Sequence, residues 1–428
     1  MSPRLLAATF ALTFPFTLRS ETPPSSLKWN LQLRTRAEIR ENLFDFDASR
    51  QAETDDAWLL TRARIGFDWQ PTPSLQLSIQ GQDARESFSQ RPDIPLRSGA
   101  EGDDAFDLRL ASLAIGTSDH LRLTVGRQAL GFGDERLVGP LEWLNFSRTF
   151  DAVTLRHTSR LWSIDAFTAS VVHPERSRFN RSDWLDPDSR NQSFSGLYFS
   201  SRFLPFQATD LYAFHLHEAH GTDFATTGFR LKGDPLHLNG WDYTIEATAQ
   251  FGNLNGHSLA AAAHHLEGGY QWTQSPWKPR LALEYSFGSG DRNPSDNRIT
   301  TFQNLFPTNH PPYGLMDLFS WQNQHNAVIR LAAHPHPKIK TTLDLHAFWL
   351  ASTADAWYRA NGTSKVRTPD PDARRFAGSE LDFTASLKLN PHADLLAGYS
   401  HFFAGSYLAD TGAHDDAHFG YLMITLNY

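Results

Sequence analysis

Residues 28–40 read KWNLQLRTRAEIR, and the character of the side chains alternates along this stretch. One face carries apolar or small residues, and the other carries only charged and amide side chains. Alternation with a period of two is typical of a β-strand whose two faces meet different surroundings. Its thirteen residues exceed the about five or six of a usual globular strand. The length suits a strand that crosses a bilayer at a tilt.

The same alternation recurs along the whole chain. Residues 241–251 and 380–389 also place apolar side chains opposite charged or hydroxyl side chains. The remaining candidate strands are 58–69, 75–82, 106–115, 121–128, 150–157, 161–171, 195–201, 210–217, 225–232, 259–272, 280–288, 325–333, 339–349, 394–403 and 418–428. The polarity of 106–115 and of 195–217 alternates poorly, so these segments carry the weakest signal.

Two classes of connection take turns between these segments. The short ones are near 70–74, 116–120, 157–160, 202–209, 233–240, 273–279, 334–338 and 390–393. The longer or more polar ones are near 41–57, 83–105, 129–149, 172–194, 218–224, 252–258, 289–324, 350–379 and 404–417. Tight periplasmic turns alternating with long outer loops are typical of an outer-membrane barrel. The pattern predicts an all-β fold, a single antiparallel transmembrane β-barrel of about eighteen strands over residues 27–428.

Both ends of the chain support export to the bacterial outer membrane. Arg4 precedes an apolar stretch, Leu5 to Leu18, and residues 1–20 are typical of a secretory signal peptide. The alternation from Gly420 continues to an aromatic last residue, Tyr428. A terminal strand of this kind resembles the signal read by the outer-membrane assembly machinery. We therefore expect that machinery and the outer-membrane lipid as partners. Trp29, Trp69, Trp162, Trp241 and Trp272 fall near the predicted periplasmic strand ends, as in an interfacial girdle.

Composition argues against several other functions. The net charge of −8 is unsuited to a nucleic-acid-binding protein. The chain has no cysteine, so it has neither disulfides nor thiolate metal sites. The pair His217 and His220 is one residue short of metalloprotease spacing. Residues 291–297 have oxygen ligands for calcium but lack a closing Glu, and turn chemistry explains them equally well. We expect no catalytic site, no metal site and no cofactor.

One run of residues resembles a known family. The motif comprises Gly126-Arg127-Gln128, residues 133–143 (GDERLVGPLEW) and Arg148-Thr149-Phe150-Asp151, with support from 305–310, 316–319 and 397–405. It resembles the alginate export family of outer-membrane proteins, from about residue 27 to the end. The resemblance implies an eighteen-stranded barrel whose Arg-rich lumen moves an anionic polysaccharide. Alginate-exporting members have a long periplasmic turn near the C-terminus, and residues 390–393 leave no room for one. This departure puts regulated alginate export in doubt.

Charge on the inward faces indicates what the lumen admits. The N-terminal strands carry nine inward basic and two acidic residues: Lys28, Arg34, Arg36, Arg40, Arg62, Arg64, Arg122, Arg230 and Lys232 against Glu38 and Asp68. The C-terminal strands carry three basic and six acidic residues: Arg280, Lys340 and Lys388 against Asp242, Glu246, Glu284, Asp344, Glu380 and Asp382. A basic wall facing an acidic one, with a basic surplus, predicts an anion pathway. The alternative is that these residues pair across strands merely to neutralise a polar interior.

The connection 129–149 is rich in charge as well. Arg127, Asp134, Glu135, Arg136 and Arg148 are candidates for an inward-folded constriction, or alternatively for a clamp that holds the loop. We expect a channel for an alginate-like anionic polysaccharide or for small anionic solutes. The alternatives are a general diffusion porin, a barrel enzyme and an adhesive barrel.

Overall fold

The computed structural model describes residues 25–50, 55–89, 103–175, 179–186, 191–219, 221–310, 312–363 and 365–428. The expected signal peptide, residues 1–20, lies outside the described residues, as does His220.

Eighteen long strands follow one another along the chain, and every candidate strand of the sequence is among them. They are β1 (Ser26–Glu41), β2 (Asp56–Thr72), β3 (Leu75–Ser87), β4 (Asp104–Gly116), β5 (Leu121–Gln128), β6 (Phe150–Thr158), β7 (Trp162–His173), β9 (Ser193–Leu204), β10 (Gln207–Glu218), β11 (Thr222–Gly233), β12 (Trp241–Leu254), β13 (His257–Gln271), β14 (Arg280–Gly288), β16 (Gln324–His336), β17 (Ile339–Leu350), β18 (Phe376–Asn390), β19 (Ala393–Ala404) and β20 (Ala417–Asn427). The two-residue strands β8 (Arg181–Ser182) and β15 (Arg298–Ile299), a 3-10 turn η1 (Ala48–Arg50) and a short helix α2 (Ser406–Thr411) lie in connections.

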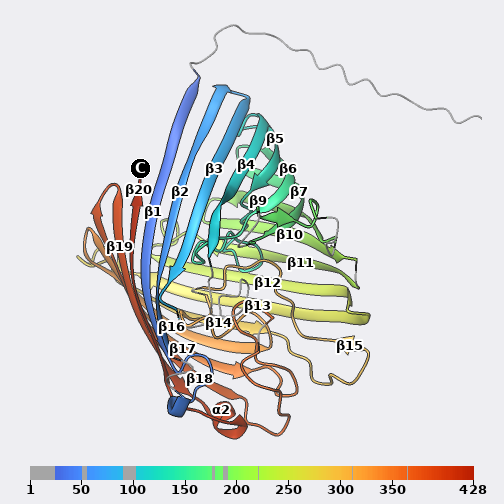
Figure 1. Cartoon of the computed structure of the whole chain (residues 1–428), viewed down its shortest axis with the longest axis vertical. Coiled ribbons are helices and arrows are strands. Elements are labelled where there is room, and N and C mark those ends of the chain that lie inside the picture. The colour runs from blue at the N-terminus through green and yellow to red at the C-terminus, as the bar shows by residue number, and fades with distance from the viewer. Residues whose placement is uncertain are drawn as a thin grey trace, which may run out of the picture.

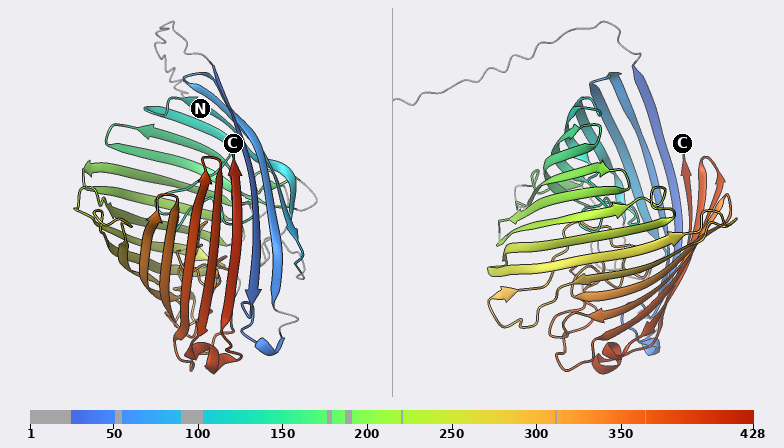
Figure 2. Two further views of the ribbon diagram at one scale, coloured as in Figure 1. Left: turned by 90° about the vertical axis from the view of Figure 1, so that its left-hand side faces the viewer. Right: turned by 180° about the vertical axis from the view of Figure 1, so that it is seen from behind.

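The long strands form one closed barrel. Each pairs antiparallel with its neighbours, and β1 pairs with β20 from Gln32↔Asn427 to Glu41↔His418. The main chains of Leu31 and Tyr428 add two more hydrogen bonds to this seam, of 3.0 and 2.9 Å. Closure leaves no unpaired sheet edge among the long strands that the structure describes. The predicted single antiparallel barrel of eighteen strands is confirmed (Figures 1 and 2).

The two faces of the wall follow the alternation of the sequence. Leu33 and Ile39 are 48% and 50% exposed on the outside, whereas Arg34 and Arg36 are 4% and 0% exposed on the inside. Trp29, Trp69, Trp241 and Trp272 lie exposed on the outer surface near the ends joined by short turns. No helix within the described ranges is long and apolar enough to cross a membrane.

A bulge explains why 106–115 alternates poorly. Gln80 pairs with Leu110 and Gly81 pairs with Leu108, so Arg109 is an extra residue without a partner in the register. The exposed apolar side chains are at even positions before it (Phe106, Leu108) and at odd positions after it (Leu113, Ile115). A bulge reverses the side-chain phase and can re-aim one residue. Here the re-aimed residue is Arg109, which turns into the lumen.

The connections differ at the two ends of the barrel. At one end, called the short-turn end, tight turns join the strands, and only Pro391 and His392 separate β18 from β19. At the other end, the long connections turn back into the barrel (Figure 1). Their side chains form an aromatic core with the inner wall at this end, in which Phe46, Phe319 and Trp357 are at most 1% exposed. The long connections therefore fill the lumen at their own end.

Two connections at this end that were placed in the longer or more polar class, near 218–224 and 252–258, are tight turns instead, because the strands extend into them: β10 ends at Glu218 and β11 begins at Thr222, and only Asn255 and Gly256 separate β12 from β13.

Candidate functional site: a constriction and a cavity in the lumen

Two connections meet inside the barrel. One joins β5 to β6 (residues 129–149, the inner loop), and the other joins β14 to β16 (residues 289–323, the facing loop). Main-chain hydrogen bonds join Gly139 to Phe306 (2.8 Å), Phe306 to Leu137 (2.9 Å) and Thr308 to Glu135 (2.9 Å). A side chain at position 139 would collide with Thr308 and Glu135, so glycine permits this close approach. The two loops form one partition across the lumen.

Predicted loop residues hold this partition. The Arg148 guanidinium donates to the carbonyl oxygens of Gly139 and Pro307, both at 3.0 Å, and the Thr308 hydroxyl donates to Glu135 at 2.8 Å. Burial lowers the pKa of Arg148 to about 10, and Glu135 partly offsets this effect. Arg136 contacts His265 and Glu246 on the wall, at 2.7 and 3.5 Å. Asp134 binds Arg230 and Lys232 at 3.1 and 2.6 Å.

Trp143 is the aromatic centre of the partition. The Arg36 guanidinium carbon lies 3.6 Å from the Trp143 ring centroid. The His310 ring stacks on Trp143 with centroids 3.9 Å apart and planes 12° apart, and Tyr421 meets the indole edge-on at 4.9 Å. Trp143 thereby joins the inner loop to the barrel wall and to the facing loop.

Arginines of the wall also hold the main chain of the inner loop. Arg34 donates to the carbonyl oxygen of Glu142 at 2.7 Å, and Arg36 donates to that of Trp143 at 2.6 Å. The Asn145 amide donates in turn to the carbonyls of Thr61 and Arg85, both at 3.1 Å. The arginines thus satisfy loop carbonyls, and Asn145 joins the loop to carbonyls of the wall.

Three further arginines converge on one side chain of the same loop. The Glu142 carboxylate lies 2.6 Å from Arg109, 2.9 Å from Arg64 and 3.2 Å from Arg62. Burial raises the pKa of Glu142, but Arg64 and Arg109 outweigh that effect, so its pKa falls to about 2. Glu142 therefore stays ionised near neutral pH.

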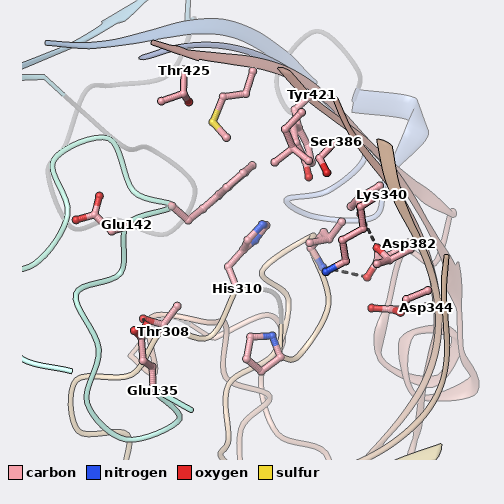
Figure 3. Close-up of a pocket in the computed structure, with 18 of the residues that line it drawn as sticks. Glu135, Glu142, Thr308, His310, Lys340, Asp344, Asp382, Ser386, Tyr421 and Thr425 are labelled. Atoms are coloured by element: carbon pink, nitrogen blue, oxygen red, sulfur yellow. Dashed lines mark hydrogen bonds between the residues drawn. The ribbon is translucent and has the colours of Figure 1, made fainter. Parts of the chain in front are cut away.

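A cavity of about 1170 Å³ lies between this partition and the short-turn end. Figure 3 shows Glu135 and Glu142 of the inner loop and His310 of the facing loop across the space from Lys340, Asp382 and Tyr421 of the wall. Eight basic and five acidic side chains line it: Arg34, Arg62, Arg64, Arg136, Lys278, Arg280, Arg330 and Lys340 with Glu135, Glu142, Glu284, Asp344 and Asp382.

Other predicted residues are paired within the wall. Arg36 and Arg40 both bind Glu38, at 2.6 and 2.8 Å. Arg127 binds Asp151 at 2.9 Å. Arg122 donates to Gln76 at 2.6 Å, and Gln76 donates to Asp68 at 3.2 Å.

The acidic side of the lumen is paired as well. Arg280 binds Asp242, and Arg330 binds Glu284 at 3.1 Å and Asp344 at 3.0 Å. Main-chain N–H groups of the facing loop reach two more carboxylates: that of Met316 donates to Glu380 at 2.9 Å, and that of Leu315 donates to Asp382 at 3.2 Å.

Sequence reasoning missed Arg109, Arg330 and the roles of Glu142, Trp143 and His310. The phase reversal at the bulge hid Arg109. Glu142 and Trp143 belong to the family motif, which was the available signal for them.

The two weak metal candidates have other partners. His215 and His217 both contact Asp223, at 2.9 and 3.2 Å. In the calcium candidate, Asp291 and Asp296 accept main-chain N–H groups of the same turn, at 3.0 and 2.8 Å. Among the described residues, no group of three or more His, Asp or Glu side chains could hold a metal ion.

Comparison with solved structures shows the same fold. OccAB4 of Acinetobacter baumannii superposes with a TM-score of 0.64 at 10% identity, over 96% of this chain and 100% of that chain. OccAB1 of the same organism gives 0.62 at 12% identity, over 94% and 96%. OpdK of Pseudomonas aeruginosa, solved with vanillate, gives 0.57 at 11% identity, over 94% and 98%. The fold is thus that of outer-membrane porins.

Sequence comparison identifies the family. Among curated proteins, none matches the chain. The family model described as alginate export, in contrast, matches residues 25–421, which is nearly the whole barrel. The match includes both loops of the partition and the arginines that hold them. The chain belongs to the alginate export family, and its family and fold are those of an outer-membrane channel.

Proposed function

We propose that this outer-membrane channel passes anionic solutes that carry carboxylate groups, either an alginate-like polysaccharide or small organic anions. The main observation in support of this proposal is the cavity of about 1170 Å³, whose lining has eight basic and five acidic side chains. Five of the eight are arginines of the barrel wall. A guanidinium stays charged and matches the geometry of a carboxylate, so this lining favours anions.

Two comparisons support a carboxylate. The family model is described as alginate export, and alginate is a polymer of sugar carboxylates. The OpdK barrel was solved with vanillate, which is an aromatic carboxylate. We place the gate at the partition of inner and facing loops, because it bounds the cavity towards the long connections.

The test is ion selectivity in planar bilayers. Under a salt gradient the reversal potential should show a preference for anions. The preference should weaken in concentrated salt, because the Debye length falls from about 10 Å at 0.1 M to about 3 Å at 1 M. Replacing Lys278 and Lys340 together with Gln should reduce the preference, since both line the cavity and both belong to segments outside the two loops of the partition.

A matched change on the outer face provides the control. Leu31→Val with Leu33→Val alters only the exposed surface and should leave the reversal potential unchanged. A wild-type pore that prefers cations contradicts the proposal. The acidic members of the lining favour the alternative of a general porin, which an unselective wild-type pore would support.

Location is tested separately. The protein expressed with residues 1–20 should fractionate with the outer membrane and show heat-modifiable gel mobility. A product recovered in the soluble periplasmic fraction contradicts this placement.

A further inference from the structure

Arg62, Arg64 and Arg109 form a pocket that fits a carboxylate. Arg62 and Arg64 come from β2 and Arg109 from β4, and they hold both oxygens of one carboxylate: Arg109 binds Oε1, and Arg62 and Arg64 bind Oε2. The three arginine side chains are at most 9% exposed, whereas the Glu142 side chain is 43% exposed and faces the cavity. The carboxylate is thus the exposed partner, and the arginines lie behind it.

Neutral side chains hold these arginines in place independently of Glu142. Arg62 donates to Gln32 at 2.7 Å, and Arg64 and Arg109 donate to Gln82 and Gln80, each at 2.7 Å. An amide oxygen orients a guanidinium without neutralising it. The three positive charges therefore face a single carboxylate, and the pocket is preorganised when that carboxylate leaves.

The main chain of the inner loop does not depend on the Glu142 side chain. Arg34 holds the Glu142 carbonyl, Arg36 holds the Trp143 carbonyl, and Asn145 bonds to the wall. The Glu142 side chain can consequently swing out of the pocket while the loop stays docked.

We propose that Arg62, Arg64 and Arg109 are a binding site for the carboxylate group of a passing solute, and that Glu142 is a built-in carboxylate which the solute displaces. The proposal rests on the anion pathway proposed above and names its binding site. The tethered Glu142 competes at a high effective concentration, in the mM range or above for a short tether. A solute carboxylate must displace Glu142 from the arginines in order to bind, so the solute binds weakly and is released fast.

The experiment measures binding of galacturonate to the detergent-purified full-length barrel by isothermal titration calorimetry at low chloride. Galactose is the matched uncharged probe, because it lacks the carboxylate. If Glu142 occupies the pocket more than nine-tenths of the time, the apparent Kd is at least about tenfold weaker than that of the free site. Glu142→Gln should therefore strengthen galacturonate binding at least about tenfold, with no gain for galactose.

Glu135→Gln is the matched charge control. It removes one negative charge from the same loop and the same cavity, but Glu135 contacts Thr308 rather than the three arginines. The change in galacturonate affinity in Glu135→Gln measures the general electrostatic effect of removing one negative charge. The gain in affinity in Glu142→Gln must be larger than this change. Adding Arg109→Gln to Glu142→Gln should cancel the gain. Should Glu142→Gln assemble poorly, Glu142→Ala removes the same carboxylate and should give the same gain.

The outcomes separate this site from the proposed function. Equal gains in Glu142→Gln and Glu135→Gln overturn the site, because charge alone then explains them. Absence of galacturonate binding in every variant, with anion selectivity retained in bilayers, also overturns the site and leaves the anion pathway standing. A cation-selective wild-type pore overturns the anion pathway itself.

Discussion

Removing the indole of Trp143 should loosen the partition in the lumen. Trp143 stacks between Arg36, at 3.6 Å, and His310, at 3.9 Å, and meets Tyr421 edge-on at 4.9 Å. A desolvated cation–π contact is worth about 2 kcal/mol, and each aromatic pair about 0.5–1.5 kcal/mol. These contacts together agree with the about 3–5 kcal/mol typical of Trp→Ala in a packed site. A loss of about 4 kcal/mol shifts the ratio of docked to undocked loop about a thousandfold.

Two measurements check the Trp143→Ala variant. Single-channel recordings should show larger or more frequent openings, because the loop leaves the partition more often. Trypsin should cleave after Arg136 or Arg148 faster than in the wild type, since cleavage follows the population of the open loop. Trp143→Phe keeps a ring between Arg36 and His310. Its channel openings and its rate of trypsin cleavage should therefore lie between those of the wild type and those of Trp143→Ala.

Trp277→Ala is the control for the loss of an indole. Trp277 is 60% exposed on the turn between β13 and β14, away from the partition. It should leave channel openings and trypsin cleavage unchanged. A Trp143→Ala barrel that assembles, keeps wild-type conductance and resists trypsin equally would refute the assignment of Trp143 as the centre of the partition.

Three further predictions concern the wall, its seam and pH. Leu422→Arg puts a charge on the lipid face and should lower the free energy of unfolding by about 2–4 kcal/mol near the midplane, as measured by urea unfolding. Met423→Arg on the cavity side is the control and should be tolerated. Equal losses of stability in the two variants would mean that the facing of β20 is wrong. Deleting Tyr428 removes two main-chain bonds to Leu31 and should lower the yield of heat-modifiable barrel; an unchanged yield contradicts a role in closure. Because the pKa of Glu142 is depressed to about 2, its contact with the arginines is complete above about pH 4.5 and is lost as the pH falls towards 2. Anion preference should rise over that range more in the wild type than in Glu142→Gln, because protonation of Glu142 leaves the three arginines without its charge, and equal pH profiles would exclude Glu142 as the titrating group.

The strands could be predicted because their signal is local. Each side chain of β1 faces lipid or lumen according to odd or even position, so residues 28–40 reveal both faces without any partner. In 106–115 the signal failed because the register shifts. The extra residue Arg109 inverts the phase of β4, and an inverted phase looks in sequence like a poor strand.

The candidate site could be predicted only in part. Arg34, Arg62 and Arg64 were identified as inward-facing because alternation places them there. Their partner Glu142 lies on the inner loop, 78 to 108 residues away along the chain, and no local pattern indicates which loop residue a wall arginine meets. The sequence therefore left open whether this loop forms a constriction, a clamp or both.

By itself, the sequence determined the barrel, its strand number and the facing of its side chains, because a period of two and the loop lengths are properties of neighbouring residues. Only the tertiary structure decided what the inward charges do. Arg34 and Arg36 hold loop carbonyls, Arg62, Arg64 and Arg109 hold Glu142, and Arg330 holds Glu284 and Asp344. The physical reason is that a buried charge is stabilised by the opposite charge or carbonyl group that lies within about 3 Å of it. In this barrel the loops that fold back into the lumen determine which group that is.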